Sequence, residues 1–439
     1  MNTNTSYDLI VIGGGPIGLS TAYHGAKEGL KILVIEKFSY FNNLGSSAGY
    51  SRQFRLQYEQ DYMSQLSLSS QPFWCHLQRY TDVPLVGSEG SLWFGQNISG
   101  TQEGGIDKAK VTMDTLGIPY EPLANAQGIE SKASFEGLPK AYYGFFQKDG
   151  GTINVKATEQ VLYNAALATG NVTFKEWESV VNIDNSEENC IKVFTQRSGQ
   201  GMETLSYYQS AKLAITAGAY VNDTVRYLGF SVPILIWQMA SAYFKKIDEH
   251  AHFPSWFAFQ SKPEDSPYQP ESATNSLLYG FPELDWANPG FVRVATDFPD
   301  YKIIYDPSER QLAPSAKSLD IASSWVEQFM PGLDPTPQHT STCLIALCND
   351  PKLEEQPEFF LDYLPKEQPN SKNIVTYTAG WAGKFIPIMG DMIIKMLQEP
   401  ALEKFTYSEG ERVFNIPRNH FAINWQPAGE VSPVKKESK

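Results

Sequence analysis

The sequence predicts a mixed α/β fold, α+β overall, in which a Rossmann-type dinucleotide-binding domain is interrupted by an antiparallel-sheet domain. The chain opens with an apolar, β-branched run that is followed by spaced glycines and a helical pattern. Segments of the same type return in the middle and near the end, and strand-rich segments lie between them. At 439 residues the chain is long enough to bury two hydrophobic cores.

A glycine-rich turn directly after the first strand, 9–12, predicts the nucleotide site. The turn matches the G-x-G-x-x-G spacing and comprises Gly13, Gly15, Pro16, Ile17 and Gly18. Glycine is needed here because a tight turn brings backbone N–H groups against a pyrophosphate at the N-terminus of the following helix. Residues 20–27 continue with helical spacing, so the stretch is typical of a strand, a turn and a helix.

The second strand, 31–35, strengthens this prediction because it ends at an acid. Glu36 lies 18 residues after Gly18, about the spacing at which a carboxylate accepts the ribose hydroxyls of an adenosine. A glutamate would repel the extra phosphate of NADP, which is therefore disfavoured. The pattern alone does not separate FAD from NAD.

Periodicity predicts the remaining elements in chain order. Helical spacing covers 63–81, 106–116, 154–169, 314–330 and 387–397. Strand-like runs cover 91–94, 171–174, 179–183, 191–195, 206–217, 233–246, 290–296, 342–348, 359–362 and 373–378.

This order predicts a discontinuous domain organisation. We expect a dinucleotide-binding domain from 1–90, 150–230 and 340–400, a substrate domain from 91–149 and 231–339, and a partly disordered C-terminal extension at 401–439. Such a discontinuity fits a glutathione-reductase-like FAD fold better than a two-piece NAD dehydrogenase.

Composition excludes several other classes of protein. The formal charge is −14 and no apolar run approaches the ~20 residues of a membrane helix, so we expect neither a nucleic-acid partner nor a membrane partner. The first strand begins at about residue 7, which leaves no room for a signal peptide. Four cysteines (Cys75, Cys190, Cys343 and Cys348) form no disulfide framework in so long a chain. We expect a cytoplasmic protein without a metal site.

A basic stretch follows Glu36. Two clusters of small residues, 45–47 and 49, precede Arg52 and Arg55. If the chain coils here, arginines three residues apart share one side. The alternative is a solvated basic turn.

Four motifs in this order resemble the D-amino-acid-oxidase superfamily of FAD enzymes, in its monomeric sarcosine oxidase and N-methyltryptophan oxidase branch. The first is the glycine turn with Glu36. The second, 45–55 (GSSAGYSRQFR), is similar to the family's GSSHGxTRxxR. The third is 213–220 (LAITAGAY), and the fourth is the pair 342–344 (TCL) and 378–384 (TAGWAGK). The similarity runs along roughly residues 7–398.

The resemblance implies FAD as the cofactor and assigns residues to it. Besides the turn and Glu36, the implied contacts are Lys37, Gly45, Ser46, Ser47, Arg52, Val180, Ala217, Gly218, Gly380, Gly383 and Lys384. Cys343 matches the cysteine that forms a thioether to the flavin 8α-methyl group. The alternative for Cys343 is a buried, inert thiol.

The same resemblance implies a substrate site. Arg55 matches the arginine that holds the substrate carboxylate, for which a guanidinium fork is suited. Arg52 matches the arginine near the flavin, and Tyr279 matches an aromatic on the substrate face, with ordinary packing as its alternative. Lys384 matches a second carboxylate partner. Because about three residues of the family's pattern are missing before it, the alternative is a lysine that points at the isoalloxazine or at solvent.

Three departures from the family bear on the chemistry. Arg293 stands where the family has a lysine that helps oxygen accept electrons, and its charge can stabilise a developing superoxide. Asp297 stands at a histidine and is expected to face a cationic or hydrogen-bond-donating substrate group; a solvated or salt-bridged aspartate is the alternative. Ile345 replaces a tyrosine, so we expect a substrate larger than sarcosine.

The resemblance therefore implies oxidation of the C–N bond of a primary or N-alkyl amino acid to an imine. Molecular oxygen would accept the electrons and give hydrogen peroxide. Arg55 and Lys384 would orient the carboxylate without a strong general base. The alternatives are an amine dehydrogenase or a biosynthetic oxidase of a cyclic or primary amine, a non-catalytic flavin-binding protein, and an NAD-dependent dehydrogenase. We expect a monomer or small homo-oligomer.

Overall fold

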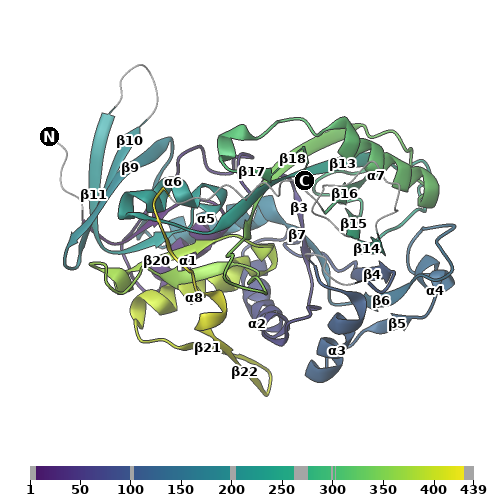
Figure 1. Cartoon of the computed structure of the whole chain (residues 1–439), viewed down its shortest axis with the longest axis horizontal. Coiled ribbons are helices and arrows are strands. Elements are labelled where there is room, and N and C mark those ends of the chain that lie inside the picture. The colour runs from purple at the N-terminus through teal and green to yellow at the C-terminus, as the bar shows by residue number, and fades with distance from the viewer. Residues whose placement is uncertain are drawn as a thin grey trace.

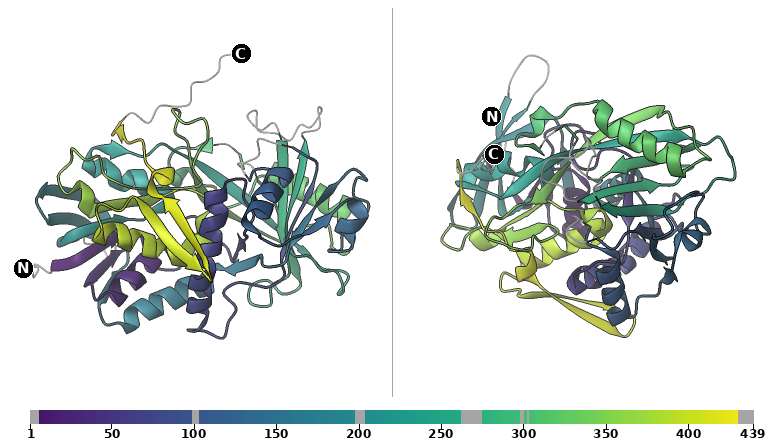
Figure 2. Two further views of the ribbon diagram at one scale, coloured as in Figure 1. Left: turned by 90° about the horizontal axis from the view of Figure 1, so that it is seen from below. Right: turned by 45° about the vertical axis from the view of Figure 1, so that its right-hand side comes forward.

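Two β-sheets form the body of the protein, which is described here from a computed structural model (Figure 1). The structure describes residues 6–98, 103–197, 204–261, 275–297, 300–301 and 303–429. One sheet occupies one half of the long axis of the molecule and the second sheet occupies the other half (Figure 2).

The first sheet has the parallel core that the glycine turn predicts. In spatial order its strands are β19 (Phe360–Tyr363), β20 (Ile374–Thr378), β11 (Thr204–Ile215), β1 (Ser6–Ile12), β2 (Ile32–Ile35) and β8 (Val172–Lys175). Along this path β19 is antiparallel to β20 and the other pairings are parallel. The far part of β11 continues into an antiparallel arm with β10 (Cys190–Arg197) and β9 (Glu178–Glu187), which projects at the upper left of Figure 1.

Helices cover one face of this sheet. α1 (Pro16–Lys27) packs against both α5 (Val155–Ala168) and α8 (Ile386–Gln398). In β1, Leu9 and Val11 belong to the hydrophobic cluster on the helix side, whereas Ile10 and Ile12 belong to the cluster on the opposite face. The strand is therefore buried on both faces, as its uninterrupted apolar run predicts.

The second sheet is built mainly from antiparallel pairs. In spatial order its strands are β17 (Ile303–Ile304), β13 (Ile234–Lys245), β16 (Phe291–Thr296), β15 (Asn275–Phe281), β14 (Ser255–Ser261), β4 (Ser91–Gly95), β6 (Tyr143–Gln147) and β5 (Glu121–Leu123). β14 and β4 run parallel to each other. β18 (His339–Cys348) lies in the predicted dinucleotide-binding segment 340–400, yet it is hydrogen-bonded to β13 of this sheet.

Helices and short ribbons complete the fold. One face of the second sheet packs against α7 (Ala316–Phe329) and α4 (Ala126–Glu130) in a separate hydrophobic cluster. The remaining elements are α2 (Asp61–Gln78), α3 (Ile106–Leu116), α6 (Val221–Val225), and the strand pairs β3 (Ser51–Phe54) with β7 (Gly151–Asn154) and β12 (Phe230–Ser231) with β23 (Gln426–Pro427).

Side-chain caps account for the helix boundaries that the sequence predicts. The Asn154 side chain accepts a hydrogen bond from the Ala157 N–H at the start of α5, and the Ser315 side chain does the same for Ser318 at the start of α7. Each cap satisfies an N–H that has no partner within the helix. Gly117 ends α3 with φ of 64°, a left-handed conformation that favours glycine.

The structure corrects the predicted coil at the basic stretch. Residues 51–54 form strand β3, which pairs antiparallel with β7. Arg52 therefore lies on a strand and Arg55 just after its end, and it is not a helical turn that brings both of them to the cavity wall. A solvated basic turn is also wrong, because Arg55 is buried.

The C-terminal extension contains a hairpin within its described part. β21 (Lys404–Glu409) and β22 (Arg412–Pro417) form a hairpin, and their Phe405 and Ile416 side chains are buried in the same cluster as α8. The predicted disorder at 431–439 lies outside the described residues. Within the described ranges, no helix is both long and apolar enough to cross a membrane.

Candidate functional site

The glycine turn after β1 is shaped by close main-chain contacts. Gly13 has φ of +102°, and a Cβ there would lie 2.6 Å from the Thr216 carbonyl oxygen. A Cβ on Gly18 would lie 1.9 Å from the Gly13 oxygen, so α1 can begin this close to the turn only with glycine at that position. Gly15 has nothing within 4 Å of its virtual Cβ. It faces open space at the N-terminus of α1, as a phosphate cradle requires.

Glu36 locks this turn from the end of β2. One carboxylate oxygen accepts a hydrogen bond from the Gly14 N–H at 2.7 Å, and the other accepts one from the Phe38 N–H at 2.9 Å. Burial raises the pKa of Glu36, and these two N–H donors partly oppose the rise. Each carboxylate oxygen retains capacity for a further donor such as a ribose hydroxyl.

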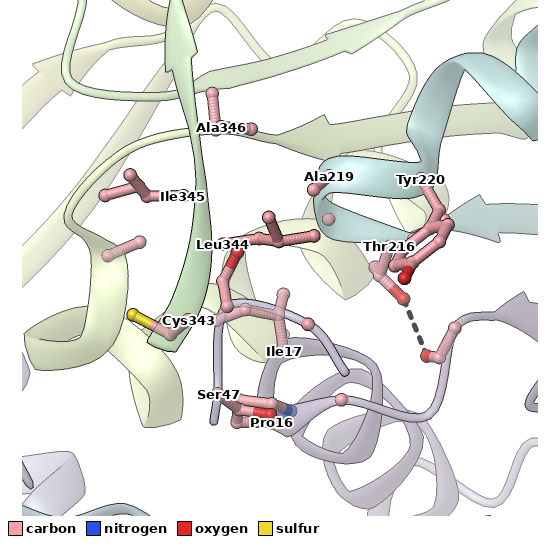
Figure 3. A pocket seen from close by; sticks show the side chains of 18 of the residues that line it. Pro16, Ile17, Ser47, Thr216, Ala219, Tyr220, Cys343, Leu344, Ile345 and Ala346 are labelled. Carbon is pink, nitrogen blue, oxygen red and sulfur yellow. Dashed lines mark hydrogen bonds between the residues drawn. The ribbon is translucent and has the colours of Figure 1, made fainter. Parts of the chain in front are cut away.

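A single cavity of about 470 Å³ runs from the turn to the second sheet. Figure 3 shows Pro16 and Ile17 of α1, Ser47, Tyr220 and Cys343 of β18 around this space. Every residue that the sequence assigns to the cofactor or the substrate lines the cavity, except Gly18, which lies behind the turn.

Arg52 organises the loop that precedes β3. Its guanidinium donates hydrogen bonds to the main-chain carbonyls of Ser46, Ala48 and Ser51. A Cβ on Gly383 would lie 3.1 Å from the Arg52 Cβ, so the two implied cofactor segments approach each other closely. Arg52 therefore fixes the shape of the 45–48 loop at the cavity wall.

Cys343 lies near the middle of β18. Figure 3 shows Cys343 and Ile345 on one side of this strand and Leu344 on the other. The free thiol is 9% exposed and packs in a small cluster with Ala48 and Met239, against which Trp381 also packs. Its position on the cavity wall is compatible with the implied thioether.

Arg293 is buried and its guanidinium is fully engaged. Nε donates to Ser241 Oγ at 3.0 Å, Nη1 to Ser51 Oγ at 2.9 Å, and Nη2 to the Tyr279 hydroxyl at 3.4 Å. Burial lowers the pKa of Arg293, but the nearby Tyr279, Tyr243 and Cys343 groups raise it above its ordinary value. A fixed positive charge therefore stands beside Tyr279 on the cavity wall.

Arg55 is the most deeply buried arginine of the site, at 1% exposure. Its guanidinium lies over the rings of Tyr58 (4.4 Å to the centroid) and Trp93 (5.0 Å). Nη1 forms an ion pair with Glu103, whose charge raises the pKa of Arg55 against the lowering effect of burial. Nε and Nη2 have no hydrogen-bond partner in the described part of the chain.

Asp297 and Lys384 complete the substrate end. Asp297 follows β16, and neither of its carboxyl oxygens has a hydrogen-bond partner among the described residues. Asp297 is 8% exposed and forms no ion pair with a described residue, so the described part of the chain matches neither a solvated nor a salt-bridged aspartate. Burial, and then the charge of Glu103, raise the pKa of Asp297 well above its usual range.

Lys384 is 4% exposed, so a lysine that points at solvent is also wrong. Its carbonyl accepts a hydrogen bond from Trp74 Nε1 at 2.8 Å, and its ammonium lies 4.9 Å from the Tyr58 ring centroid. Burial, followed by the charge of Arg55, lowers the pKa of Lys384 to about 7.

Two acids of the site escape prediction from the sequence. Glu103 pairs with Arg55, and the half-buried Glu358, just before β19, acts electrostatically on both Lys384 and Arg55. We refer to Arg55, Glu103, Asp297, Glu358 and Lys384 as the buried charge cluster. In the sequence, the glycine pair that follows Glu103 indicates a turn at this point. In the structure Gly104 has φ of +83° and packs closely on Glu59. Glu358 carries no comparable signal.

The described residues contain no group of three or more histidine, cysteine, aspartate or glutamate side chains that could hold a metal ion. The site therefore offers main-chain donors and a glycine turn for a dinucleotide, and a set of buried charges for a small polar molecule.

Comparisons with known proteins agree with this geometry. The family model of FAD dependent oxidoreductases (DAO) matches residues 8–396. The chain is 31% identical over 427 residues to a Dictyostelium discoideum protein named as a bifunctional amine oxidase, covering 95% of this chain and 37% of that protein, so it spans well under half of that relative. It is 27% identical over 402 residues to the peroxisomal sarcosine oxidase of Homo sapiens, covering 89% of this chain and 92% of the relative.

Among solved structures, the chain is similar to NikD, described as an unusual amino acid oxidase essential for nikkomycin biosynthesis. The two share 33% sequence identity, with a TM-score of 0.81, over 96% of this chain and 98% of the other. A glycine oxidase from Geobacillus kaustophilus shares the fold at 14% identity, with a TM-score of 0.63 over 90% of this chain and 95% of the other.

Proposed function

The chain belongs to the DAO family of FAD-dependent oxidoreductases, and we propose that it oxidises the C–N bond of an amino acid larger than sarcosine. Membership of this family makes the chain an oxidoreductase that acts on amines. Its substrate, its electron acceptor and the roles of its residues are what we propose. The proposal is carried by one observation: unpartnered donors of Arg55 and unpartnered acceptors of Asp297 line the same cavity.

Buried polar atoms without partners are costly, so a ligand that satisfies them is favoured. An α-amino acid supplies both missing partners. Its carboxylate would accept hydrogen bonds from Nε and Nη2 of Arg55, with Lys384 as a second cation, while its amino group would donate to Asp297. A ligand with only one of these groups would leave the other set unsatisfied.

The site residues also fit FAD. Glu36 and the glycine turn suit the adenosine and pyrophosphate, while the 45–48 loop and the segment from Gly380 to Lys384 wall the remaining cavity. Bound there, FAD would supply a hydride acceptor for the substrate carbon and a route for the electrons to oxygen. We propose a thioether through Cys343, which lines the same cavity and packs against Ala48 of this loop.

The chain's own groups orient the substrate and supply charge for the second half of the reaction. Arg55 and Lys384 hold the carboxylate, which fixes the Cα–H direction. Asp297, whose pKa is raised by burial, accepts a hydrogen bond from the amine. Arg293 keeps a positive charge in a dry site, where it favours the build-up of negative charge on oxygen and so the formation of hydrogen peroxide.

Aromatic side chains set the size of the substrate space. Phe257, Tyr279, Phe281 and Trp381 line the cavity, and Ile345 stands where the resemblance has a tyrosine. This apolar lining suits a side chain or ring larger than the methyl group of sarcosine. The similarity to NikD favours a second candidate, a biosynthetic oxidase of a cyclic or primary amine.

Anaerobic mixing of the purified protein with primary, N-methyl and cyclic amino acids tests the proposal. Flavin absorbance is followed first without oxygen and then after air is admitted. We expect bleaching by one class and rapid recovery in air with formation of hydrogen peroxide. Bleaching without rapid recovery would indicate a dehydrogenase, and no bleaching by any class would contradict the proposed substrate.

A further inference from the structure

Strand β18 is pinned along its outer edge on both sides of Cys343. Its inner edge pairs with β13, with Cys343 opposite Met239. On the outer edge the Ala346 carbonyl accepts a hydrogen bond from the Gly380 N–H at 2.7 Å, and the Thr342 carbonyl accepts one from Arg310 Nη2. Cys343 is therefore held between two fixed points.

Arg310 joins three segments that are distant in sequence. It directly follows a short 3₁₀ turn (Pro307–Glu309). Its Nε donates to Thr342 Oγ1 at 3.1 Å, its Nη2 to the Thr342 carbonyl, and its Nη1 to the Asn43 carbonyl. All three guanidinium nitrogens are occupied by protein atoms, so the fork clamps the residue before Cys343 to the start of the cofactor loop.

The same loop is held from its other side by Arg52, through the carbonyls of Ser46 and Ala48. Ala48 packs in one cluster with Cys343. Two arginines thus fix the loop relative to the sulfur, Arg52 from within and Arg310 across to β18. These two attachments restrict the movement of the loop relative to the sulfur, and reacting groups must be held in such a fixed geometry to react efficiently.

Arg310 also contributes charge. It is about half-buried, and burial lowers its pKa, while an ionised Cys343 would oppose that lowering. The guanidinium and the sulfur are therefore within electrostatic reach of each other.

We propose that Arg310 is a positioning residue for covalent attachment of the flavin. It would hold the Cys343 sulfur in place beside the bound flavin. This inference rests on the proposed thioether. In that step the S–H bond of Cys343 and one 8α C–H bond break and an S–C bond forms. The two electrons and two protons released go to the isoalloxazine ring and then to molecular oxygen, giving hydrogen peroxide.

Two substitutions separate position from charge. Arg310→Met removes both the fork and the charge, whereas Arg310→Lys keeps the charge but loses the fork. Arg412→Met is the matched control, because Arg412 also donates to a main-chain carbonyl, that of Leu116, but lies on the distant β21–β22 hairpin. Cys343→Ser gives the background value of the covalent flavin fraction, because this variant cannot form the thioether.

The measurements use full-length protein incubated in air with excess FAD. Total FAD per chain is read from absorbance, the covalent fraction from flavin that remains after acid precipitation and from intact mass, and folding from the thermal midpoint. We expect Arg310→Met to bind FAD fully but to form the thioether about tenfold to 100-fold more slowly, as misplaced reacting groups do. Arg310→Lys should also form the thioether more slowly than the wild type, because an ammonium cannot replace the guanidinium fork that bridges Thr342 and Asn43.

Equal linkage rates in the wild type and both Arg310 variants would overturn the positioning role and leave the proposed function intact. A wild-type protein without covalent flavin would refute the thioether, and the Arg310 inference would fall with it. If Arg310→Met does not fold, the comparison of Arg310→Lys with Arg412→Met decides, because an unchanged Arg310→Lys rate contradicts the role of the fork.

Discussion

The glycine turn and the buried charge cluster border one cavity but are built in opposite ways. The turn uses main-chain groups of consecutive residues, and its shape follows from contacts such as that between Gly18 and the Gly13 oxygen. The cluster uses side chains from five separate segments, and several of its polar atoms have no partner among the described residues. The shape of the turn is thus determined by contacts within the protein, whereas the cluster holds polar atoms that no described residue satisfies.

The strongest way to break this comparison is to remove a cation from the cluster. Arg55→Met leaves the Glu103 carboxylate buried without its counter-ion, so we expect the free energy of unfolding to fall by about 3–5 kcal/mol. Urea titration of the holoprotein measures this loss. Activity should fall as well, because the substrate carboxylate loses its main donor.

The double variant Arg55→Met/Glu103→Leu is the control. If the destabilisation comes from an unpaired buried acid, the second substitution restores most of the lost stability while activity stays low. A double variant that is less stable than Arg55→Met would show instead that packing around Tyr58 and Trp93 dominates.

The corresponding change in the turn should act on the cofactor. A Cβ on Gly18 would lie 1.9 Å from a main-chain oxygen that cannot move independently. We expect Gly18→Ala to cost about 1–3 kcal/mol of FAD binding, which corresponds to roughly 5-fold to 150-fold weaker FAD retention. FAD per chain after extensive dialysis, compared in a Cys343→Ser background, measures it.

Gly128→Ala on α4 is the matched control, because the nearest atom to its virtual Cβ lies 3.6 Å away. Helical alanine replaces glycine there without a clash, so FAD content should stay at the wild-type level. Equal FAD loss in both variants would mean that the effect is not specific to the turn.

The contrast also explains what the sequence could predict. The strand, turn, helix and Glu36 follow from local patterns, and the structure places them as expected, because sterics of neighbouring residues determine them. Arg55, Lys384 and Cys343 came from resemblance, and the structure brings all three to the cavity. Glu103 and Glu358 were missed because their position depends on long-range packing, which leaves no periodic trace in the chain.

Lys384 offers a smaller, pH-dependent test of the cluster. With the pKa of Lys384 at about 7 in the free protein, the ammonium is lost as pH rises above that value. We expect the dissociation constant of propionate, a carboxylate without an amine, to rise by up to about tenfold per pH unit above 7. Flavin absorbance changes report the binding.

Lys384→Arg keeps the charge at high pH, so its propionate affinity should be nearly independent of pH between 7 and 9. Lys384→Met should bind weakly at every pH. A wild-type affinity that stays constant over this range would show that Arg55 alone holds the carboxylate.

Asp297 provides the smallest expected effect and the sharpest separation of folding from binding. Its pKa is higher in the folded protein than in the unfolded chain, so between these values the folded state holds a proton that the unfolded state has lost. Stability therefore falls as pH rises from the unfolded pKa towards the folded one, by at most about 1.4 kcal/mol per pH unit.

Asp297→Asn removes this dependence, because a neutral amide resembles the protonated acid. We expect the variant to match the wild type at low pH and to be the more stable protein at higher pH, as measured by thermal midpoints across a pH series without substrate. A parallel fall of both midpoints would assign the pH dependence to another group, and Asp297 would then be ionised in the empty site, ready to pair with an ammonium rather than to accept a hydrogen bond as a neutral acid.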